Sequence, residues 1–298
     1  MRTVAVVGGG LIGTSIGMDL HGCGVRVHII DRDPVTQAVA AERCRGYEGA
    51  PPEPADLAVI AVPPGAVAPV LREWQSSGLA RCYTDVASAK ESVHRAATAA
   101  GCALDAFVGG HPMAGSERPG PYAARAGLFT GRPWVLTPDR HTGTAALSAA
   151  LALVEACGAR LVVMGRAEHD RAVATTSHAP HVVASALASA VGAAPQEVVD
   201  LCGAGIRDAT RIAAGETGLW SDILGSNASA VAAALEPLIT ELTDALVQLR
   251  AVAGAPPGSP PRVLAGLLDR GGEGRARIMT AQPAAAPAPP PVTVPSYA

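Results

Sequence analysis

The chain has 298 residues, 49% of them hydrophobic and 16% charged, so it can bury the cores of about two domains and is not a disordered protein. Its net charge of −3 and its aromatic content of 3% argue against a nucleic-acid-binding surface, which needs a basic excess and rings for base stacking. Six dispersed cysteines without a CxxC pair favour reduced thiols over a zinc site or a disulfide framework.

The first residues run directly into an apolar, strand-like segment and show no signal-peptide pattern. No apolar stretch approaches the ~20 residues that a membrane-spanning helix requires. We therefore expect a cytoplasmic protein that contacts neither a membrane nor nucleic acid.

Short runs of β-branched residues alternate with longer alanine-rich stretches in the first half of the chain. The runs that we expect to form strands are Val4–Val7, Val25–Ile30, Leu57–Val62 and, with a weaker pattern, Arg81–Val86. Two later runs, Pro133–Thr137 and Arg160–Val163, flank a helical stretch over Thr144–Cys157. Strands that alternate with helices predict βαβ units and a mostly parallel sheet.

The pattern changes near Ala167, beyond which we predict helices only. These helices are expected over Ala167–Val191, Gln196–Cys202, Leu219–Asn227 and Ser229–Val252. Their small apolar faces are suited to close packing against each other or against a second subunit. A Pro/Gly linker, Gly254–Pro261, leads to a short segment over Arg262–Ile278. The Pro/Ala-rich stretch Gln282–Ala298 cannot bury enough apolar surface to fold, so we expect it to be disordered.

A G-x-G-x-x-G pattern over Gly8–Gly13 follows the first expected strand and opens a helical run. The first glycine allows a tight turn, the second lets the backbone approach a pyrophosphate, and the third permits close helix–strand packing. The helix start then offers free N–H groups to the phosphates. Asp31 ends the second strand, 18 residues after Gly13, where a carboxylate accepts hydrogen bonds from both ribose hydroxyls and favours NAD over NADP. The adjacent Arg32 could soften that preference.

These features predict an α/β fold with a Rossmann-type, doubly wound, mostly parallel sheet, followed by an all-helical domain. We expect a dinucleotide-binding domain over 1–165 and a helical substrate and dimerisation domain over 166–253. A linker with a short segment over 254–281 and a disordered tail over 282–298 complete the chain. The candidate cofactor residues are Gly8, Gly10, Leu11, Ile12, Gly13, Asp31, Arg32, Val62 and Pro63.

The segment Gly109–Glu117, with the sequence GGHPMAGSE, is the most informative for chemistry. A lone histidine is more often a surface or core residue than a catalyst. His111, however, stands between glycines and a proline, and we expect a loop that holds its side chain in one position at the carboxyl edge of the sheet.

Five segments, in order along the chain, resemble the prephenate/arogenate dehydrogenase family. They are Thr84–Lys90 (TDVASAK), Gly109–Glu117, Glu168–His181 (EHDRAV followed by SHAPH), Gly203–Ala213 (GAGIRDATRIA) and Leu219–Asn227 (LWSDILGSN). The resemblance extends to about Arg250. It implies an NAD-dependent oxidative decarboxylation of prephenate to 4-hydroxyphenylpyruvate, or of arogenate to tyrosine.

The resemblance also implies roles for particular residues. His111 corresponds to the family base, which takes the hydroxyl proton while hydride leaves ring C4, and an unperturbed pKa of about 6.5 suits that task. Ser88 corresponds to the serine that hydrogen-bonds the histidine and the hydroxyl. Arg211 corresponds to an arginine that binds a carboxylate through its planar fork. His181 corresponds to a substrate-contacting histidine. His178 precedes it by three residues and would share its side of a helix.

Other polar residues are weaker candidates. Asp170 and Asp208 could pair with Arg211 or with the histidines, and Pro180 should disturb the helical turn before it. Ser116 lies where the substrate side chain would be distinguished, and Glu117 could pair with an arginine at the pocket entrance. The resemblance and the helical second half together predict a homodimer.

Several alternatives remain at this point. A relative in secondary metabolism could act on 4-amino-4-deoxyprephenate, and arogenate differs from prephenate only in its side chain. A non-catalytic NAD-binding sensor would need only the glycine turn, so the presence of Ser88, His111 and Arg211 together argues against it. A general hydroxyacid or imine reductase would lack the HPMAGSE and SHAPH segments.

Overall fold

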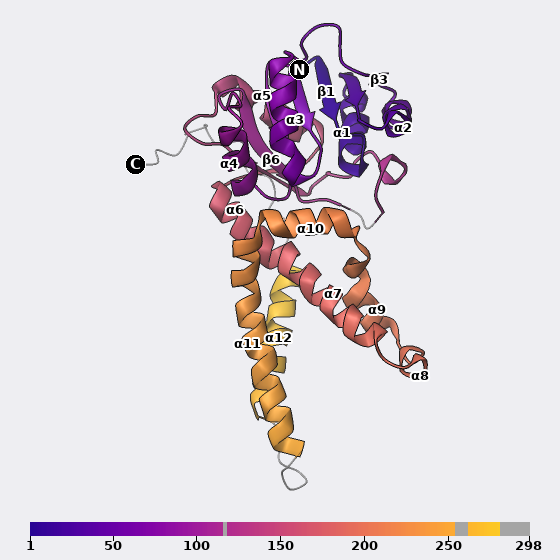
Figure 1. Cartoon of the computed structure of the whole chain (residues 1–298), viewed down its shortest axis with the longest axis vertical. Helices are drawn as coiled ribbons and strands as arrows, with labels where there is room; N and C mark the ends of the chain where they lie inside the picture. Colours follow the sequence, from indigo (N-terminus) through magenta and orange to yellow (C-terminus); the bar gives the residue numbers. More distant parts are fainter. Residues whose placement is uncertain (116–117, 254–261, 281–298) are drawn as a thin grey trace.

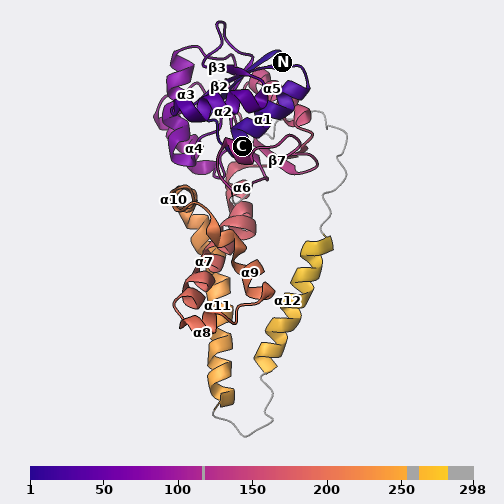
Figure 2. The same cartoon turned by 90° about the vertical axis from the view of Figure 1, so that its right-hand side faces the viewer.

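The computed structural model describes residues 1–115, 118–253 and 262–280, and it divides into a sheet-bearing part and a helical part (Figure 1). We call the described residues up to 163 the sheet region and those from 166 onward the helical region. The helical region extends from one end of the sheet region, so the molecule is elongated in both views (Figures 1 and 2). Among the described residues, no helix is long and apolar enough to cross a membrane.

Eight strands in the described part of the sheet region form one sheet in the order β3-β2-β1-β4-β5-β6-β7-β8. They are β1 (Thr3–Val7), β2 (Arg26–Ile30), β3 (Tyr47–Glu48), β4 (Leu57–Ile60), β5 (Tyr83–Asp85), β6 (Phe107–Pro112), β7 (Pro133–Thr137) and β8 (Arg160–Val163). All neighbours are parallel except β6 and β7. The strand order reverses between β1 and β4, and open sheets of this kind bind ligands at that point, beside the carboxyl ends of the strands.

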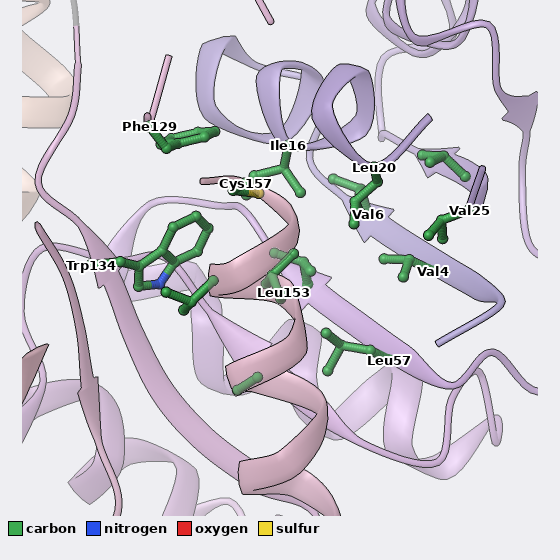
Figure 3. Packing of buried hydrophobic residues seen from close by; sticks show 14 of the residues in the cluster. Val4, Val6, Ile16, Leu20, Val25, Leu57, Phe129, Trp134, Leu153 and Cys157 are labelled. Atoms are coloured by element: carbon green, nitrogen blue, oxygen red, sulfur yellow. The ribbon is translucent and has the colours of Figure 1, made fainter. Parts of the chain in front are cut away.

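Helices cover both faces of this sheet. They are α1 (Leu11–Gly22), α2 (Pro34–Cys44), α3 (Pro64–Ser76), α4 (Glu91–Ala99) and α5 (Thr144–Ala156). Val4 and Val6 of β1 pack on one face in a buried cluster with residues of α1 and α5 (Figure 3). Ala5 and Val7 point to the other face and pack with residues of α3 and α4. Because both faces are buried, the central strands β1 and β4 are nearly continuous apolar runs.

The helical region contains α6 (Arg166–Val173), α7 (Ala179–Gly192), α8 (Gln196–Val199), α9 (Ala204–Thr210), α10 (Thr217–Ser226), α11 (Ala228–Ala253) and α12 (Arg262–Thr280). A π-helical turn, Ala174–His178, joins α6 to α7, and Pro180 follows in the first turn of α7. Pro180 has no N–H to donate to the preceding turn, and the chain widens there as the sequence predicts. Such π turns are frequent at functional sites.

The structure confirms a mostly parallel Rossmann-type sheet followed by helices. It also contains β3, β6 and α9, which the sequence analysis did not predict. The helix expected over Gln196–Cys202 ends at Val199, and the one expected over Ala167–Val191 is interrupted by the π turn. The tail over 282–298, expected to be disordered, lies outside the described residues.

A helix cap joins the two regions. Asp222 on α10 accepts a hydrogen bond of 2.9 Å from the backbone N–H of Gly65, at the start of α3. Pro63 precedes α3 and has no side chain that can cap it, so Asp222 supplies the acceptor that an N-cap residue normally provides. A Cβ at position 65 would come within 2.9 Å of the Asp222 carboxylate, which explains the glycine.

Asp222→Ala is expected to lower the free energy of unfolding by about 1 kcal/mol, because the Gly65 N–H and the positive end of α3 lose their acceptor. Asp222→Asn keeps a side-chain carbonyl oxygen and is expected to cost distinctly less. Urea denaturation followed by circular dichroism measures both changes. Equal stability of Asp222→Ala and the wild type would mean that this contact does not help to hold the regions together.

Candidate active site

The glycine turn after β1 has a shape that fits a pyrophosphate. Gly8 has a φ of 112°, and a Cβ there would overlap the Ala61 carbonyl oxygen. A Cβ at Gly13 would overlap the Gly8 carbonyl oxygen, so this glycine lets α1 pack against the turn. At Gly10, by contrast, no described atom lies within 4 Å of the position of a Cβ. The turn is closed at its first and third glycines and open at its second, where a phosphate would meet the backbone.

Asp31 follows β2 and lies beside the same turn. Its Oδ2 accepts a hydrogen bond of 2.7 Å from the Gly9 N–H, and its Oδ1 accepts one of 2.9 Å from the Asp33 N–H. The half-buried carboxylate is thus fixed at the carboxyl edge of the sheet. In dinucleotide-binding folds, an acidic residue at this position binds the ribose hydroxyls of the cofactor. Arg32 is exposed. The other candidate cofactor residues at this edge are Leu11, Ile12, Val62 and Pro63.

His111 lies on strand β6, so the expectation of a loop at this position is wrong. The strand pairs with β7 in antiparallel register, with His111 opposite Val135. The neighbouring Gly110 donates its N–H to Asp85 Oδ1 at 2.8 Å, and its carbonyl oxygen accepts from Lys90 Nζ at 2.7 Å. These bonds on both sides fix the backbone that carries His111.

A buried ion pair holds β5 and β6 together next to this histidine. Lys90 Nζ and Asp85 Oδ2 are 2.5 Å apart, and both side chains are almost inaccessible to solvent. Burial lowers the pKa of Lys90, and the Asp85 carboxylate opposes that shift. A Cβ at Gly110 would come within 2.7 Å of the Asp85 carbonyl oxygen. The glycine before His111 is therefore required for close strand packing, which is why a Gly-Gly pair occurs inside a strand.

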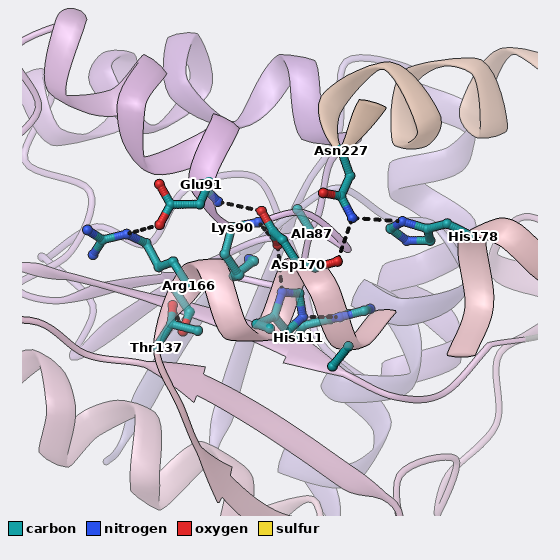
Figure 4. Close-up of polar contacts among 12 residues, drawn as sticks. Ala87, Lys90, Glu91, His111, Thr137, Arg166, Asp170, His178 and Asn227 are labelled. Carbon is teal, nitrogen blue, oxygen red and sulfur yellow. Dashed lines mark hydrogen bonds and ion pairs between the residues drawn. The ribbon is translucent and has the colours of Figure 1, made fainter. Parts of the chain in front are cut away.

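Two histidines and an aspartate form a hydrogen-bonded chain beside β6 (Figure 4). His111 Nδ1 is 2.8 Å from His169 Nε2, and His169 Nδ1 is 2.8 Å from Asp170 Oδ1. Asp170 Oδ1 also accepts from the Lys90 N–H at 2.8 Å, and its Oδ2 accepts from the Glu91 N–H at 2.9 Å. Helix α6 is thereby attached both to the start of α4 and to the histidine on β6.

His178 and His181 are buried and both contact one indole ring. His181 stacks on Trp220 with ring centroids 3.5 Å apart and planes inclined by 11°, whereas His178 lies edge-on to the same ring at 6.3 Å. The Asn227 amide nitrogen is 3.1 Å from His178 Nδ1 and donates to the Asp170 carbonyl oxygen at 2.8 Å. The two histidines therefore share one side of their segment, as their spacing of three predicts.

Several buried polar side-chain atoms have no hydrogen-bond partner within the part of the chain that the structure describes. Three of them belong to residues singled out from the sequence: Ser88 Oγ, His178 Nε2 and His181 Nδ1. Ser88 lies between β5 and α4, and β5 pairs with the strand that carries His111. Native proteins leave few buried polar atoms unpaired because each costs free energy. These atoms mark a place where a polar ligand would gain hydrogen bonds.

Burial controls the protonation of the site. It lowers the pKa of His111 well below 6.5, and the nearby His169 lowers it further. It also lowers the pKa of His178 to about 4 and that of His181 below its usual value. Burial alone would raise the pKa of Asp170, but hydrogen bonds from His169 and from two backbone N–H groups lower it on balance. At neutral pH the site thus combines neutral His111 and His178 with an ionised carboxylate, an arrangement suited to proton acceptance.

The structure does not gather every predicted residue at His111. Arg211 begins a 3₁₀ turn after α9 and is exposed, and Asp208 is exposed on α9. Asp170, expected to pair with Arg211 or with the histidines, binds His169 and the start of α4, and its charge opposes the lowering of the His178 pKa. Ser116 and Glu117 lie outside the described residues.

The sequence analysis assigned no role to four residues that shape the site. These residues are Lys90, His169, Trp220 and Asn227. All four lie within the motif segments, and this location is the feature of the sequence that could have identified them as site residues. Their partners could not be found from spacing, because His111 and His169 are 58 positions apart in the sequence.

Comparison with known proteins assigns both regions to one family. The sequence model described as prephenate dehydrogenase, nucleotide-binding domain, matches residues 16–163, and the one described as prephenate dehydrogenase, dimerization domain, matches residues 166–252. A relative named probable prephenate dehydrogenase NovF, from Streptomyces niveus, is 42% identical over 254 residues, covering 85% of this chain and 70% of that protein.

Two solved structures share the whole arrangement. Prephenate dehydrogenase from A. aeolicus, in complex with hydroxyphenyl propionate and NAD+, is 25% identical with a TM-score of 0.81, covering 93% of this chain and 98% of that one. Arogenate dehydrogenase from Synechocystis is 26% identical with a TM-score of 0.73, covering 92% of this chain and 99% of that one. The sheet and helical regions therefore occur together in dehydrogenases of this type.

A matched pair of glycine substitutions tests the cofactor turn. Gly10→Ala is expected to leave the stability of the ligand-free protein unchanged but to weaken NAD+ binding by about tenfold or more, because its Cβ enters the open space of the turn. Gly13→Ala is expected to destabilise the fold by about 1–3 kcal/mol, because its Cβ overlaps the Gly8 carbonyl. Thermal denaturation without ligand and calorimetric titration with NAD+ separate the two effects. Unchanged NAD+ affinity in Gly10→Ala would contradict this placement of the cofactor.

Proposed function

The chain belongs to the prephenate dehydrogenase family, and we propose that it oxidises and decarboxylates prephenate to 4-hydroxyphenylpyruvate with His111 as the base. As a member of this family it is an NAD-dependent dehydrogenase. The name of the 42% identical relative, a probable prephenate dehydrogenase, supports prephenate as the substrate.

The observation that carries the proposal is that three residues singled out from the sequence have buried polar atoms without a partner. Ser88 Oγ, His178 Nε2 and His181 Nδ1 need partners that the described part of the chain does not provide. Prephenate carries a hydroxyl on ring C4, a ring carboxylate and a side-chain carboxylate, and these groups would satisfy such atoms. Neutral imidazole can donate an N–H to a carboxylate, and a serine hydroxyl can donate to or accept from the C4 hydroxyl.

His111 performs the proton transfer in this proposal. Bound NAD supplies the hydride acceptor for the reaction. His111 accepts the proton of the C4 hydroxyl as hydride leaves C4, and a neutral imidazole can perform this deprotonation of the substrate. The ring carboxylate then leaves as carbon dioxide, its bonding electrons enter the ring, and His111 returns the proton to the oxygen on C4. The ring becomes aromatic, and no further oxidant is required.

Substrate carboxylates need hydrogen-bond donors and positive charge. We assign Arg211 to one carboxylate because its planar guanidinium forms two parallel hydrogen bonds with such a group. The 3₁₀ turn that Arg211 begins ends next to His181, since a Cβ at Gly215 would come within 3.0 Å of that ring. Ser116, Glu117 and Asp208 stay candidates for the side-chain end of the substrate.

We place the domain boundary near residue 165, with a dinucleotide-binding domain over 1–165 and a substrate and dimerisation domain over 166–253. The two family matches, which meet between residues 163 and 166, support this division. We also propose a homodimer formed through the helical domain. Exposed apolar residues on α11 support it: Leu238, Ile239, Leu242, Leu246, Val247 and Leu249.

A substrate comparison tests the reaction directly. Purified protein with NAD+ is offered prephenate, arogenate and 4-amino-4-deoxyprephenate separately, and NADH formation is followed at its absorbance maximum. We expect the highest kcat/KM with prephenate, with one carbon dioxide released per NADH. Preference for arogenate would keep the mechanism and change the side-chain specificity. Activity with the amino analogue only would place the protein in secondary metabolism, and no turnover of any substrate would refute the proposal.

Removal of the base tests the role of His111. His111→Asn is expected to lower kcat by about 10²–10⁴-fold with little change in NAD+ affinity, because the proton acceptor is lost and the cofactor turn is intact. In the wild type, activity should fall only as the pH drops through the depressed pKa of His111, because the ring accepts no proton once it is protonated. An acidic limb in the pH profile of kcat/KM with its midpoint at or above pH 6.5 would contradict this assignment.

The dimer is tested by charge insertion on α11. Ile239→Glu combined with Leu242→Glu is expected to yield monomers in size-exclusion chromatography with light scattering, because two apolar positions become charged in the interface. Val35→Glu changes an equally exposed apolar residue of the sheet region and should leave the dimer intact. A wild-type protein that is monomeric at all concentrations would refute the proposal.

A further inference from the structure

We propose that Asp170 and His169 are positioning residues that hold His111 in the Nδ1–H tautomer, which leaves the lone pair on its Nε2 to accept the substrate proton. The inference rests on the proposed function, in which that proton comes from the C4 hydroxyl of the substrate. Its structural basis is the chain of hydrogen bonds from Asp170 through His169 to His111 (Figure 4).

The direction of each hydrogen bond follows from the carboxylate. An ionised Asp170 has only acceptors, so the hydrogen of its 2.8 Å contact with His169 resides on His169 Nδ1. A neutral His169 then has a bare Nε2. Because His169 Nε2 is 2.8 Å from His111 Nδ1, the hydrogen of that contact resides on His111 Nδ1. In a neutral imidazole with Nδ1 protonated, Nε2 is the acceptor that a general base needs.

The Asp170 carboxylate, which determines where these hydrogens reside, is itself held in place. Its two oxygens accept the backbone N–H groups of Lys90 and Glu91 at the start of α4, where the helix dipole also favours negative charge. The Asn227 amide holds the Asp170 carbonyl oxygen. The Asp170 side chain therefore cannot rotate away without breaking its contacts with the start of α4 and with His169.

If the hydrogen between the two histidines resided on His169 Nε2 instead, His169 would carry hydrogens on both ring nitrogens and would be an imidazolium. His169 is fully buried, and the buried Lys90 already supplies a cation close to His111. The groups that face His111 are the ion pair of Asp85 and Lys90 from the β5–α4 segment, His169 and Asp170 from α6, and His178 from the π turn. The Asp170 carboxylate is already shared with two backbone N–H groups, so it is less able to stabilise a second buried cation beside it.

This arrangement also assists the reaction. When His111 takes up the substrate proton, its Nδ1–H donates to an acceptor that is backed by a carboxylate, and the hydrogen bond strengthens. Without His169, the ring of His111 is free to take the Nε2–H tautomer, in which the substrate-facing nitrogen is a donor and cannot act as a base.

Nitrogen NMR of the full-length protein with bound NAD+ tests the tautomer without turnover. Protein labelled with ¹⁵N-histidine shows separate signals for protonated and bare ring nitrogens, and comparison with His111→Asn identifies the signals of His111. We expect a protonated Nδ1 and a bare Nε2 at neutral pH. A protonated Nε2 on His111 would overturn the proposal, whatever the enzyme turns over.

Two substitutions at position 169 supply the kinetic test. His169→Gln keeps a side-chain oxygen that can accept from His111 Nδ1, whereas His169→Met fills similar space without a strong acceptor. We expect His169→Met to lower kcat by about 10²-fold with little change in KM, because His111 loses the acceptor that keeps its hydrogen on Nδ1. His169→Gln should restore much of kcat.

Controls separate positioning from folding. His94→Gln alters a half-buried histidine on α4 whose Nε2 lies 3.1 Å from Asp139 Oδ2, and it should change neither the His111 signals nor kcat. Equal kcat in His169→Met and His169→Gln would overturn the proposal. If His169→Met fails to fold, the wild-type NMR spectrum still decides. If the enzyme turns over prephenate but His111 carries its hydrogen on Nε2, only the positioning role of Asp170 and His169 is refuted. If His111 carries its hydrogen on Nδ1 but no substrate is turned over, only the proposed function is refuted.

Discussion

The Asp170 carboxylate is the point at which the two regions of the molecule and the chemistry meet. It accepts two backbone N–H groups at the start of α4 in the sheet region, although it is carried by α6 of the helical region. The same carboxylate binds His169, which reaches His111 on β6. The contacts that dock the helical region on the sheet region therefore also orient His111, the proposed base. In the proposed mechanism, any movement that separates the two regions would remove the hydrogen-bond partner of His111 and lower activity.

The sheet region supplies the complementary constraint. Asp85 and Lys90 form a buried ion pair that binds both backbone groups of Gly110 and so fixes the strand next to His111. Removal of one member would leave a buried charge without its partner, which typically costs several kcal/mol. The glycine turn is also constrained by close packing, because Gly8 and Gly13 have no space for a side chain. At Gly10, by contrast, the position of a Cβ is open. Rigid backbone thus surrounds the place where hydride and proton would be transferred.

The sequence predicts most of the fold because its signals are local. The glycine turn, the apolar strands and the change to helical periodicity each occupy one short window, and the structure confirms the architecture that they imply. The loop expected around His111 is wrong because Gly109, Gly110 and Pro112 normally mark turns. Here the glycine is required by packing against Asp85, a contact between separate strands. The link from His111 to His169 likewise depends on tertiary structure, so motif membership indicated the residues but not their partners.

The central claim is that His111 and Ser88 receive the oxygen on C4 of the substrate at the carboxyl edge of the sheet. A crystal structure of the wild-type protein with NAD+ and 4-hydroxyphenylpyruvate tests it most directly. We predict that the phenol oxygen lies about 2.6–3.2 Å from both His111 Nε2 and Ser88 Oγ, with the carboxylate end toward His181 and Arg211. A ligand bound away from these two atoms, or a His111 ring that turns Nδ1 toward the ligand, would contradict the account.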